Sequence, residues 1–299
     1  PVKPDPTIAI LYLNSIIVIY SIVNKFMKNN ITKLTAYEIG TLLDQNKTDP
    51  ISLLELFIEN YNISEEGAKN GITKILKKEA FLAAEQSRIR QKDNRRLSIF
   101  DGIPSGWKDV IDIKGHPAFG GSLLLKKIRR NKKVKDAYAV SLAKKNGIIP
   151  LFKTSTVEFA FGGLGTNSSF KFPKNQMYKR FRCPGGSSSG SASSVFSNLI
   201  PIAIGTDTAG SVRIPSCWHG LVGFKPTYNN ISCEGVLPLS RFYDTVGTIC
   251  KSVRDTLILY NILSKNNFNY YPAKRKYKIG IVTDFNLPSL ETKDKLIFE

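Results

Sequence analysis

Apolar and polar positions recur along the chain at helical spacing in four stretches. Residues 34–61 contain two such runs, separated at Thr48-Asp49-Pro50, which is typical of a helix start with proline in the first turn. Residues 65–93 are rich in Ala, Lys and Glu, and they predict a further helical stretch. Residues 136–146 and 253–263 each predict one more helix.

Short apolar runs bounded by glycine, proline or polar residues predict buried strands between these helices. The runs are residues 148–152, 199–204, 221–224 and 277–282. Because helical and strand patterns alternate along the chain, we expect an α/β protein with layers of helix and sheet.

The longest apolar run lies near the beginning of the sequence, from Ile8 to Val23 (residues 8–23). It is shorter than the roughly twenty residues that a membrane-spanning helix needs, and Asn14 and Ser15 interrupt it. A membrane anchor, a signal-like segment and a helix packed on the body all stay open as interpretations.

Composition and charge narrow the class of protein. Apolar residues make up 42% of the 299 residues and charged residues 22%, as in an ordinary globular protein. The net charge of +19 could indicate nucleic acid or an anionic membrane, but the lysines are scattered and few aromatics lie among them. We therefore favour a basic surface that is exposed to solvent. Its basic residues cluster at residues 126–133. The four cysteines have no metal-binding or disulfide spacing and suggest a reducing compartment.

Two turns rich in glycine and serine bracket the strand expected at residues 199–204. The first turn is residues 184–190 and the second is residues 205–211. Glycine allows a backbone to approach a ligand closely and to direct N–H groups at it. A serine in such a turn combines a nucleophile with donors for an oxyanion, which acyl transfer requires.

Three other interpretations of these turns are weaker. Residues 186–190 fit the G-x-S-x-G elbow, which would make Ser188 the nucleophile, but a cationic segment precedes them and no histidine follows His219. A phosphate-binding loop would need Gly-Lys-Ser/Thr after the glycines. Flexible loops, or the start of a helix made of small residues after Gly190, are the remaining alternative.

A serine nucleophile needs a base. His116 and His219 are the only histidines, and we interpret them as a surface turn residue and a packing residue. Some serine enzymes use lysine instead of histidine. Lys108 lies in an apolar stretch between turns, where burial would lower its pKa and allow the neutral amine to accept a proton. Lys153 is a second candidate base.

Three segments of this sequence resemble the amidase signature family. They are Gly102 to Asp109 (a G-[IV]-P-x-x-x-K-D pattern), residues 153–159 (K-T-[NS]-x-x-E-[FL]) and the glycine- and serine-rich segment 183–227. All three occur in the order typical of the family, and the resemblance extends over residues 34–282. Residues 105–107 depart from the small or apolar residues that usually precede the family's lysine, because Trp107 is next to it.

The resemblance implies a Ser–Ser–Lys triad. Ser211 matches the nucleophile, Ser187 the bridging serine on a cis peptide, and Lys108 the base. The matching oxyanion-hole donors are the peptide N–H groups of Thr208, Ala209, Gly210 and Ser211. The matching supporting residues are Ser188, Asp207 and Arg213. Asp244 and Glu158 are expected to be structural.

The resemblance further implies an amidase signature fold, with a mixed central β-sheet covered by helices on both faces. We expect residues 1–33 to be an added apolar extension and residues 34–299 to be the amidase domain, incomplete at its C-terminus. No metal or cofactor is implied.

The expected function is hydrolysis of a small-molecule carboxylic amide through an acyl-enzyme. The first alternative is an amidotransferase A-type subunit that supplies ammonia for tRNA-dependent amidation, although the segments around residues 205–215 and 222–240 look closer to general amidases. The second is an inactive truncated homologue. No nucleic acid is expected unless the protein is of the amidotransferase type. A homodimer is compatible with the resemblance. The expected location is cytoplasmic, with membrane association through residues 8–23 as the alternative.

Overall fold

A computed structural model describes residues 31–264 of the chain. The apolar run at residues 8–23 and the strand expected at residues 277–282 lie outside the described residues. Within residues 31–264, no helix is long and apolar enough to cross a membrane.

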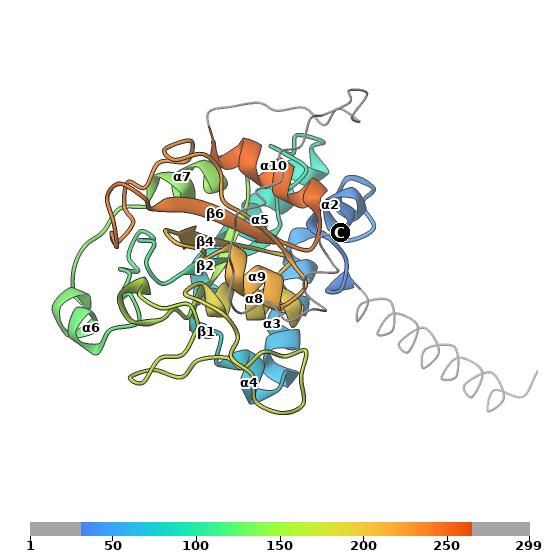
Figure 1. Ribbon diagram of the computed structural model, residues 1–299. Coiled ribbons are helices and arrows are strands. Elements are labelled where there is room, and N and C mark those ends of the chain that lie inside the picture. Colours follow the sequence, from blue (N-terminus) through green and yellow to red (C-terminus); the bar gives the residue numbers. More distant parts are fainter. Residues whose placement is uncertain (1–30, 265–299) are drawn as a thin grey trace, which may run out of the picture. The chain divides into compact units, whose positions relative to one another are not determined.

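The described residues form an α/β structure around one six-stranded mixed sheet (Figure 1). The strands are β1 (Ile72–Ile75), β2 (Pro104–Lys108), β3 (Ile149–Thr154), β4 (Ile202–Asp207), β5 (Val222–Phe224) and β6 (Thr245–Cys250). Their order across the sheet is β1-β3-β2-β4-β6-β5. The three central strands β3, β2 and β4 are parallel, whereas β1 and β6 run antiparallel to their neighbours. The predicted mixed central sheet is confirmed.

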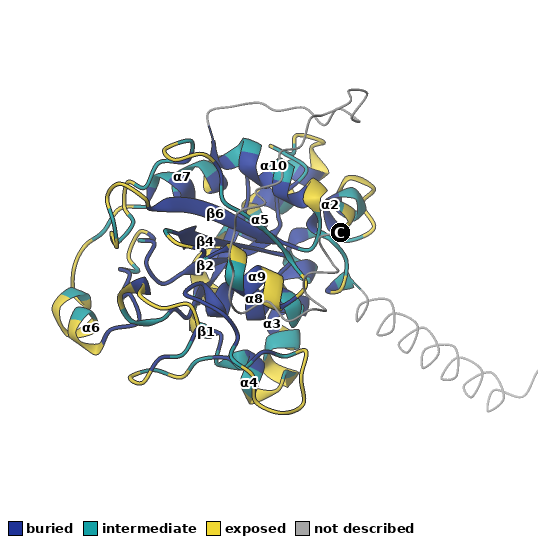
Figure 2. Cartoon of the chain, viewed as in Figure 1, coloured by how far each residue is buried: buried dark blue, intermediate teal, exposed yellow. Residues whose placement is uncertain are grey.

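Helices cover both faces of the sheet. The α-helices of the described residues are α2 (Ala36–Asp44), α3 (Pro50–Ile63), α4 (Glu66–Lys69), α5 (Lys77–Lys92), α6 (Leu123–Arg129), α7 (Tyr138–Lys145), α8 (Ser189–Phe196), α9 (Arg213–Trp218) and α10 (Val253–Leu263), with a 3-10 turn at Glu158–Ala160. Helix α6 has no buried residue. Figure 1 shows α8 and α9 on one side of the sheet and α7 and α10 on the other. Strands β2, β3, β4 and β6 are buried throughout, whereas the edge strands β1 and β5 are only partly buried (Figure 2).

The helices predicted from periodicity are confirmed, with one correction. Residues 65–93 do not form a single helical stretch, because α4 ends before Gly71 and strand β1 precedes α5. Ile72 and Ile75 pair with Thr154 and Phe152 of β3, far along the chain. The gain from extending the sheet outweighs the local helical preference of this short segment.

Small residues on β2 and β4 allow α8 to lie close to the sheet. A Cβ atom on Gly106 would approach a side-chain carbon of Ile200 to 2.3 Å, and one on Gly205 would lie 2.6 Å from the Ser188 hydroxyl. Gly190 of α8 is equally confined, since its Cβ would lie 2.4 Å from the backbone nitrogen of Ser155. This close approach brings the turn before α8 next to the carboxyl end of β2.

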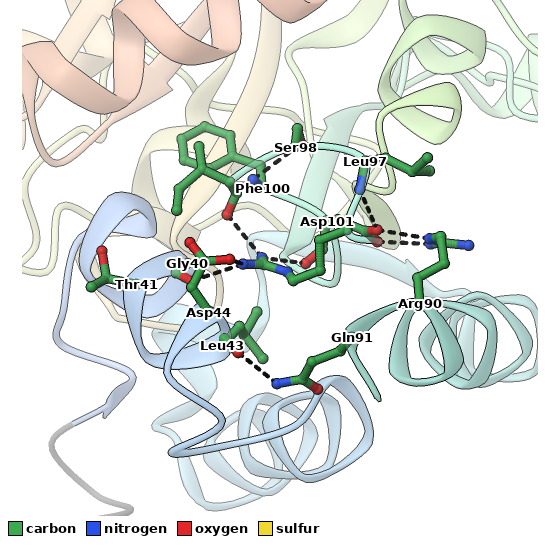
Figure 3. Close-up of polar contacts among 12 residues, drawn as sticks. Gly40, Thr41, Leu43, Asp44, Arg90, Gln91, Leu97, Ser98, Phe100 and Asp101 are labelled. Atoms are coloured by element: carbon green, nitrogen blue, oxygen red, sulfur yellow. Dashed lines mark hydrogen bonds and ion pairs between the residues drawn. The ribbon is translucent and has the colours of Figure 1, made fainter. Parts of the chain in front are cut away.

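A buried polar network fixes the loop that leads into β2 (Figure 3). The Asp101 carboxylate accepts two hydrogen bonds from Arg90 of α5, both 2.7 Å long, and one from the backbone N–H of Leu97. Arg96 donates to the carbonyl oxygens of Gly40 and Asp101 and pairs with Asp44. Helices α2 and α5 are thereby tied to the segment that positions Lys108 (Figure 3).

Candidate active site

Lys108 is the last residue of β2, and its side chain is completely buried. Its ammonium nitrogen, Nζ, donates to Ser187 Oγ at 2.8 Å and to Thr206 Oγ1 at 2.9 Å, with a longer contact of 3.4 Å to the Thr206 carbonyl. Among the described residues, Lys108 forms no ion pair. The lysine is therefore held by hydroxyl groups rather than by a carboxylate.

This environment allows Lys108 to exist as the neutral amine. Burial lowers the pKa of Lys108 to about 7, and the nearby charges of Asp207 and Asp244 only partly oppose the effect. A substantial fraction of the amine is then unprotonated near neutral pH. A neutral lysine next to a serine hydroxyl can act as a general base.

Ser187 is placed by the first glycine-rich turn. The N–H groups of Gly185 and Gly186 donate to the carbonyls of Leu164 and Gly163, at 3.1 and 2.7 Å. Gly186 must be glycine, because a Cβ there would lie 2.7 Å from the backbone of Gly165. The peptide bond between Gly186 and Ser187 is cis, as the family resemblance implies. Helix α8 begins two residues later and is built of small side chains.

Ser211 follows Gly210, whose φ of +113° favours glycine, at the end of the second turn. The Ser188 N–H donates to the Ser211 carbonyl at 3.1 Å, so the two turns are joined directly. Ser211 is half-buried and the neighbouring Ala209 is exposed, whereas Ser187 is completely buried. Ser211 is therefore the accessible serine of the site, whereas Ser187 and the Lys108 amine are buried. No hydrogen bond joins the hydroxyls of Ser187 and Ser211 within residues 31–264.

Asp207 organises the backbone of the second turn. Its completely buried carboxylate accepts hydrogen bonds from the N–H groups of Gly210 and Val212 at 2.8 and 3.1 Å. The Arg213 side chain donates to both carboxylate oxygens, at 2.9 and 3.0 Å. Burial alone would raise the pKa of Asp207, but the Arg213 and backbone hydrogen bonds outweigh it and lower that pKa.

This network distinguishes one of the four N–H groups expected to bind an oxyanion from the other three. The Gly210 N–H is directed at Asp207, whereas within the described residues the N–H groups of Thr208, Ala209 and Ser211 have no hydrogen-bond acceptor. We therefore expect these three groups to be the donors to an oxyanion. The choice depends on the Asp207 side chain, which the spacing of the motif does not specify.

We expect Asp207→Asn to lower the free energy of unfolding by about 2–3 kcal/mol at pH 7, because it removes a charge that Arg213 and two buried N–H groups require. Since the pKa of Asp207 is lowered by folding, its stabilisation is present above the pKa of the unfolded chain and is lost as pH falls through the lower folded value. Urea unfolding at pH 7 and pH 3 measures both effects.

The control for this prediction is Asp93→Asn, which alters an ion pair with Arg95 on the surface. Its expected effect is at most about 1 kcal/mol. Equal losses in both variants would contradict an organising role for Asp207.

Two further residues contact the site: Thr206, which the sequence does not single out, and Asp244, which it predicts to be structural. Thr206 receives the second hydrogen bond from Lys108, and the Ser188 hydroxyl donates to its carbonyl at 3.3 Å. Asp244, expected to be structural, accepts the Thr208 hydroxyl at 2.5 Å and the N–H groups of Leu239 and Ser240. It therefore anchors the segment before β6 to the second turn.

The other candidates for nucleophile and base lie in surroundings that differ from those of Ser211 and Lys108. The Ser188 hydroxyl is completely buried, so it does not have the exposed position of an elbow nucleophile. Lys153 forms an ion pair of 3.2 Å with Asp109 and donates to the Ile111 carbonyl. His116 contacts Glu79, while His219 is buried against the Pro215 carbonyl, and that burial lowers its pKa. Neither histidine contacts either of the two serines.

Comparison with known proteins identifies the fold as that of an amidase. The amidase family model matches residues 52–296, and the chain therefore belongs to the amidase signature family. The A-type subunit of the glutamyl-tRNA(Gln) amidotransferase of Clostridium botulinum (strain Okra / Type B1) is 33% identical over 235 residues, 79% of this chain and 47% of the relative. The corresponding protein of Fusobacterium nucleatum is 32% identical over 257 residues, which is 86% of this chain and 52% of that protein.

Solved structures agree with this assignment. The peptide amidase of Stenotrophomonas maltophilia superposes with a TM-score of 0.71 at 27% identity, over 78% of this chain and 48% of that one. A crystal structure described as an amidase gives a TM-score of 0.69 at 32% identity, over 77% and 51% of the two chains. The chain thus spans about half the length of the relatives that it matches.

Proposed function

We propose that this chain carries the catalytic centre of an enzyme that cleaves carboxylic amides, with Ser211 as nucleophile, Ser187 as bridge and Lys108 as base. The observation that carries the proposal is the 2.8 Å contact between Lys108 Nζ and Ser187 Oγ in a completely buried setting. The hydrogen bond between Ser188 and Ser211 supports it, because it keeps the accessible serine beside the buried pair.

In the proposed reaction, the neutral amine of Lys108 takes the Ser187 proton while Ser187 takes the Ser211 proton. Ser211 Oγ forms a bond to the amide carbon, and the carbonyl oxygen becomes an oxyanion that the N–H groups of Thr208, Ala209 and Ser211 stabilise. The C–N bond then breaks as Ser187 returns a proton to the leaving amine. Water attacks the acyl-serine by the same proton route and releases the acid.

The direct test is labelling with a fluorophosphonate, which phosphonylates an activated serine, followed by mass spectrometry of the modified peptide. We expect the adduct on Ser211. An adduct on Ser188 would contradict the assignment and support the elbow interpretation. Wild-type chain that takes up no label at any pH, while its thermal unfolding stays cooperative, would support an inactive homologue.

The rate of this labelling is expected to rise with pH and to level off above an apparent pKa of about 7. Lys108 must be neutral to act as a base, and burial lowers its pKa to about that value. Protonation below this pH removes the base, so the rate is lost as pH falls. An apparent pKa near the ordinary lysine value of about 10.4 would contradict the role of Lys108. The rate should be measured between pH 5.5 and 9.5 at constant ionic strength, and Thr206→Val tests whether the second hydroxyl contact shifts the profile.

A second candidate function is the glutaminase step of a tRNA-dependent amidotransferase. The observation that favours it is the 32–33% identity to the A-type subunits of glutamyl-tRNA(Gln) amidotransferases. Both functions use the same acyl-enzyme chemistry and release ammonia from a primary amide. Assays of ammonia release from glutamine and from a panel of simple amides separate them, because an amidotransferase component would prefer glutamine and respond to its partner proteins and tRNA.

A further inference from the structure

A cavity of about 460 Å³ lies at the carboxyl ends of β2 and β3, next to β1. Its walls come from these strands, from the loop after β2, from α6 and from the segment around Phe170. None of Ser187, Ser211 and Lys108 lines it. In open α/β sheets, ligands bind in crevices beyond the carboxyl ends of the strands. The cavity is therefore in a position that suits a ligand, and it is separate from the two serines and the lysine.

The walls of this cavity carry an excess of positive charge. Lys74, Lys126 and Arg130 line it, and none of the three has an ion-pair partner among the described residues. Lys126 also lies over the Phe170 ring, with its Nζ 5.7 Å from the ring centroid. The only carboxylate in the lining is Asp109, whose charge is compensated by Lys153 at 3.2 Å.

Two further basic residues line the cavity and have partners at its edge. Lys171 pairs with Glu66 at 2.7 Å, and about three quarters of each side chain is exposed. Such an exposed ion pair is weak, so Lys171 could leave Glu66 and bind a ligand instead. His116 contacts Glu79 at 3.0 Å. Neither carboxylate lies in the lining. Glu79 attracts Lys74 electrostatically and partly compensates its charge, so Lys126 and Arg130 carry most of the uncompensated charge.

The floor of the cavity supplies neutral donors. Ser155 and Thr156 are 2% and 3% exposed, and within the described residues their hydroxyl groups have no hydrogen-bond partner. Buried polar groups are nearly always satisfied, because an unsatisfied one costs roughly 1–3 kcal/mol. Both residues line the cavity, but the Ser155 hydroxyl lies against Gly190 of α8, where a Cβ atom would be 2.6 Å from it. The Thr156 hydroxyl is therefore the donor that we assign to a ligand in the cavity.

We propose that this cavity is a binding site for a small phosphorylated ligand. A phosphate group presents several acceptor oxygens and about two negative charges, which match Lys126 and Arg130 at α6, Lys74 of β1 and the unsatisfied Thr156 hydroxyl. A single carboxylate would leave most of this charge uncompensated. The enclosed volume suits a small molecule rather than a polyanion chain.

The site has a direct structural connection to the serines. Residues Ser155 and Thr156 are followed by Val157, whose N–H donates to the Ser187 carbonyl at 3.4 Å. The short segment 155–157 therefore forms part of the wall between the cavity and Ser187. A ligand bound to the Thr156 hydroxyl would hold the backbone that supports Ser187.

The test is calorimetric titration of the chain with pyrophosphate at fixed ionic strength. We expect saturable binding, weakened at least about tenfold in the double variant Lys126→Gln/Arg130→Gln, since each change removes a charge-assisted contact. The matched control is Lys127→Gln, which is compared with Lys126→Gln alone, because each removes one lysine charge from neighbouring residues of α6 and of the two only Lys126 lines the cavity. All the substituted side chains are exposed, so thermal unfolding should be unchanged.

Three results would overturn the proposal. The first is no saturation by pyrophosphate below about 10 mM, which corresponds to less than about 3 kcal/mol of binding free energy. The second is an equal loss in Lys127→Gln, which would indicate diffuse surface charge. The third is preferential binding of a short single-stranded RNA that Lys127→Gln also weakens, which would indicate a nucleic-acid surface.

Discussion

Ser211→Ala is expected to lower kcat/KM for amide hydrolysis by about 10³-fold or more, because removing the nucleophile of a serine hydrolase leaves only binding and oxyanion stabilisation. The side chain is half-buried and sits at the end of a turn that Asp207 and Gly210 already fix. The fold should therefore tolerate the loss of one hydroxyl. Ammonia release and urea unfolding, measured on the same preparation, report the two properties separately.

The matched control for this change is Ser141→Ala on α7, which lies on the other side of the sheet from α8 and α9 (Figure 1). It removes the same atom from a half-buried serine and should leave kcat/KM within about twofold of the wild type. Full activity in Ser211→Ala would refute the assignment of the nucleophile. If Ser211→Ala unfolds cooperatively at the same urea concentration as the wild type, its loss of activity is not caused by a loss of folding.

The sequence predicted the helices and strands whose formation depends on the spacing of apolar residues and on capping residues within the segment itself. The helices at residues 34–61 and 253–263 follow from apolar spacing and from capping residues, and the structure has Thr35, Asp49 and Ser252 as N-caps. The apolar strands β3 and β5 also follow from their composition. Strand β4 (Ile202–Asp207) begins later than the run expected at residues 199–204 and continues through residues 205–207, which were expected to belong to the second turn. The apolar setting of Lys108 already indicated a candidate base, whereas the roles expected of Ser187 and Ser211 came from the family resemblance.

Contacts between distant segments account for what the sequence did not predict. Strands β1 and β6 are recognisable only through their antiparallel partners β3 and β4. β2 contains Pro104 and Gly106, which disfavour a strand locally, yet it pairs on both sides. The contact between Lys108 and Thr206 joins residues 98 positions apart, so no local pattern reveals it.

Replacing Lys108 by methionine is expected to abolish activity and, at neutral pH, to stabilise the fold. Methionine fills similar volume without a group that burial makes costly to charge. Activity should fall by about 10³-fold, since no general base then accepts the Ser187 proton. Removing the buried amine should raise the free energy of unfolding. The net gain should be on the order of 1 kcal/mol or more, since the loss of the Lys108 donor to Ser187 and Thr206 offsets part of the stabilisation.

The stability difference between Lys108→Met and the wild type is expected to depend on pH. The pKa of Lys108 is about 7 in the fold and near the ordinary lysine value of about 10.4 in the unfolded chain. Between these values the unfolded state binds more protons, so wild-type stability rises with pH by about 1.4 kcal/mol per unit from this group. The advantage of Lys108→Met over the wild type should therefore shrink by about 2–3 kcal/mol between pH 7 and pH 9.

Lys153→Met is the matched control, because Lys153 is the other buried lysine on a neighbouring strand. It pairs with Asp109 at 3.2 Å, so its removal leaves a buried carboxylate without its partner. We expect that variant to lose about 3–5 kcal/mol of stability, opposite in sign to Lys108→Met. Urea unfolding at pH 7 and pH 9 measures both. A destabilised Lys108→Met whose deficit does not change with pH would show that Lys108 is charged in the folded protein, and the proposed base would be lost with it.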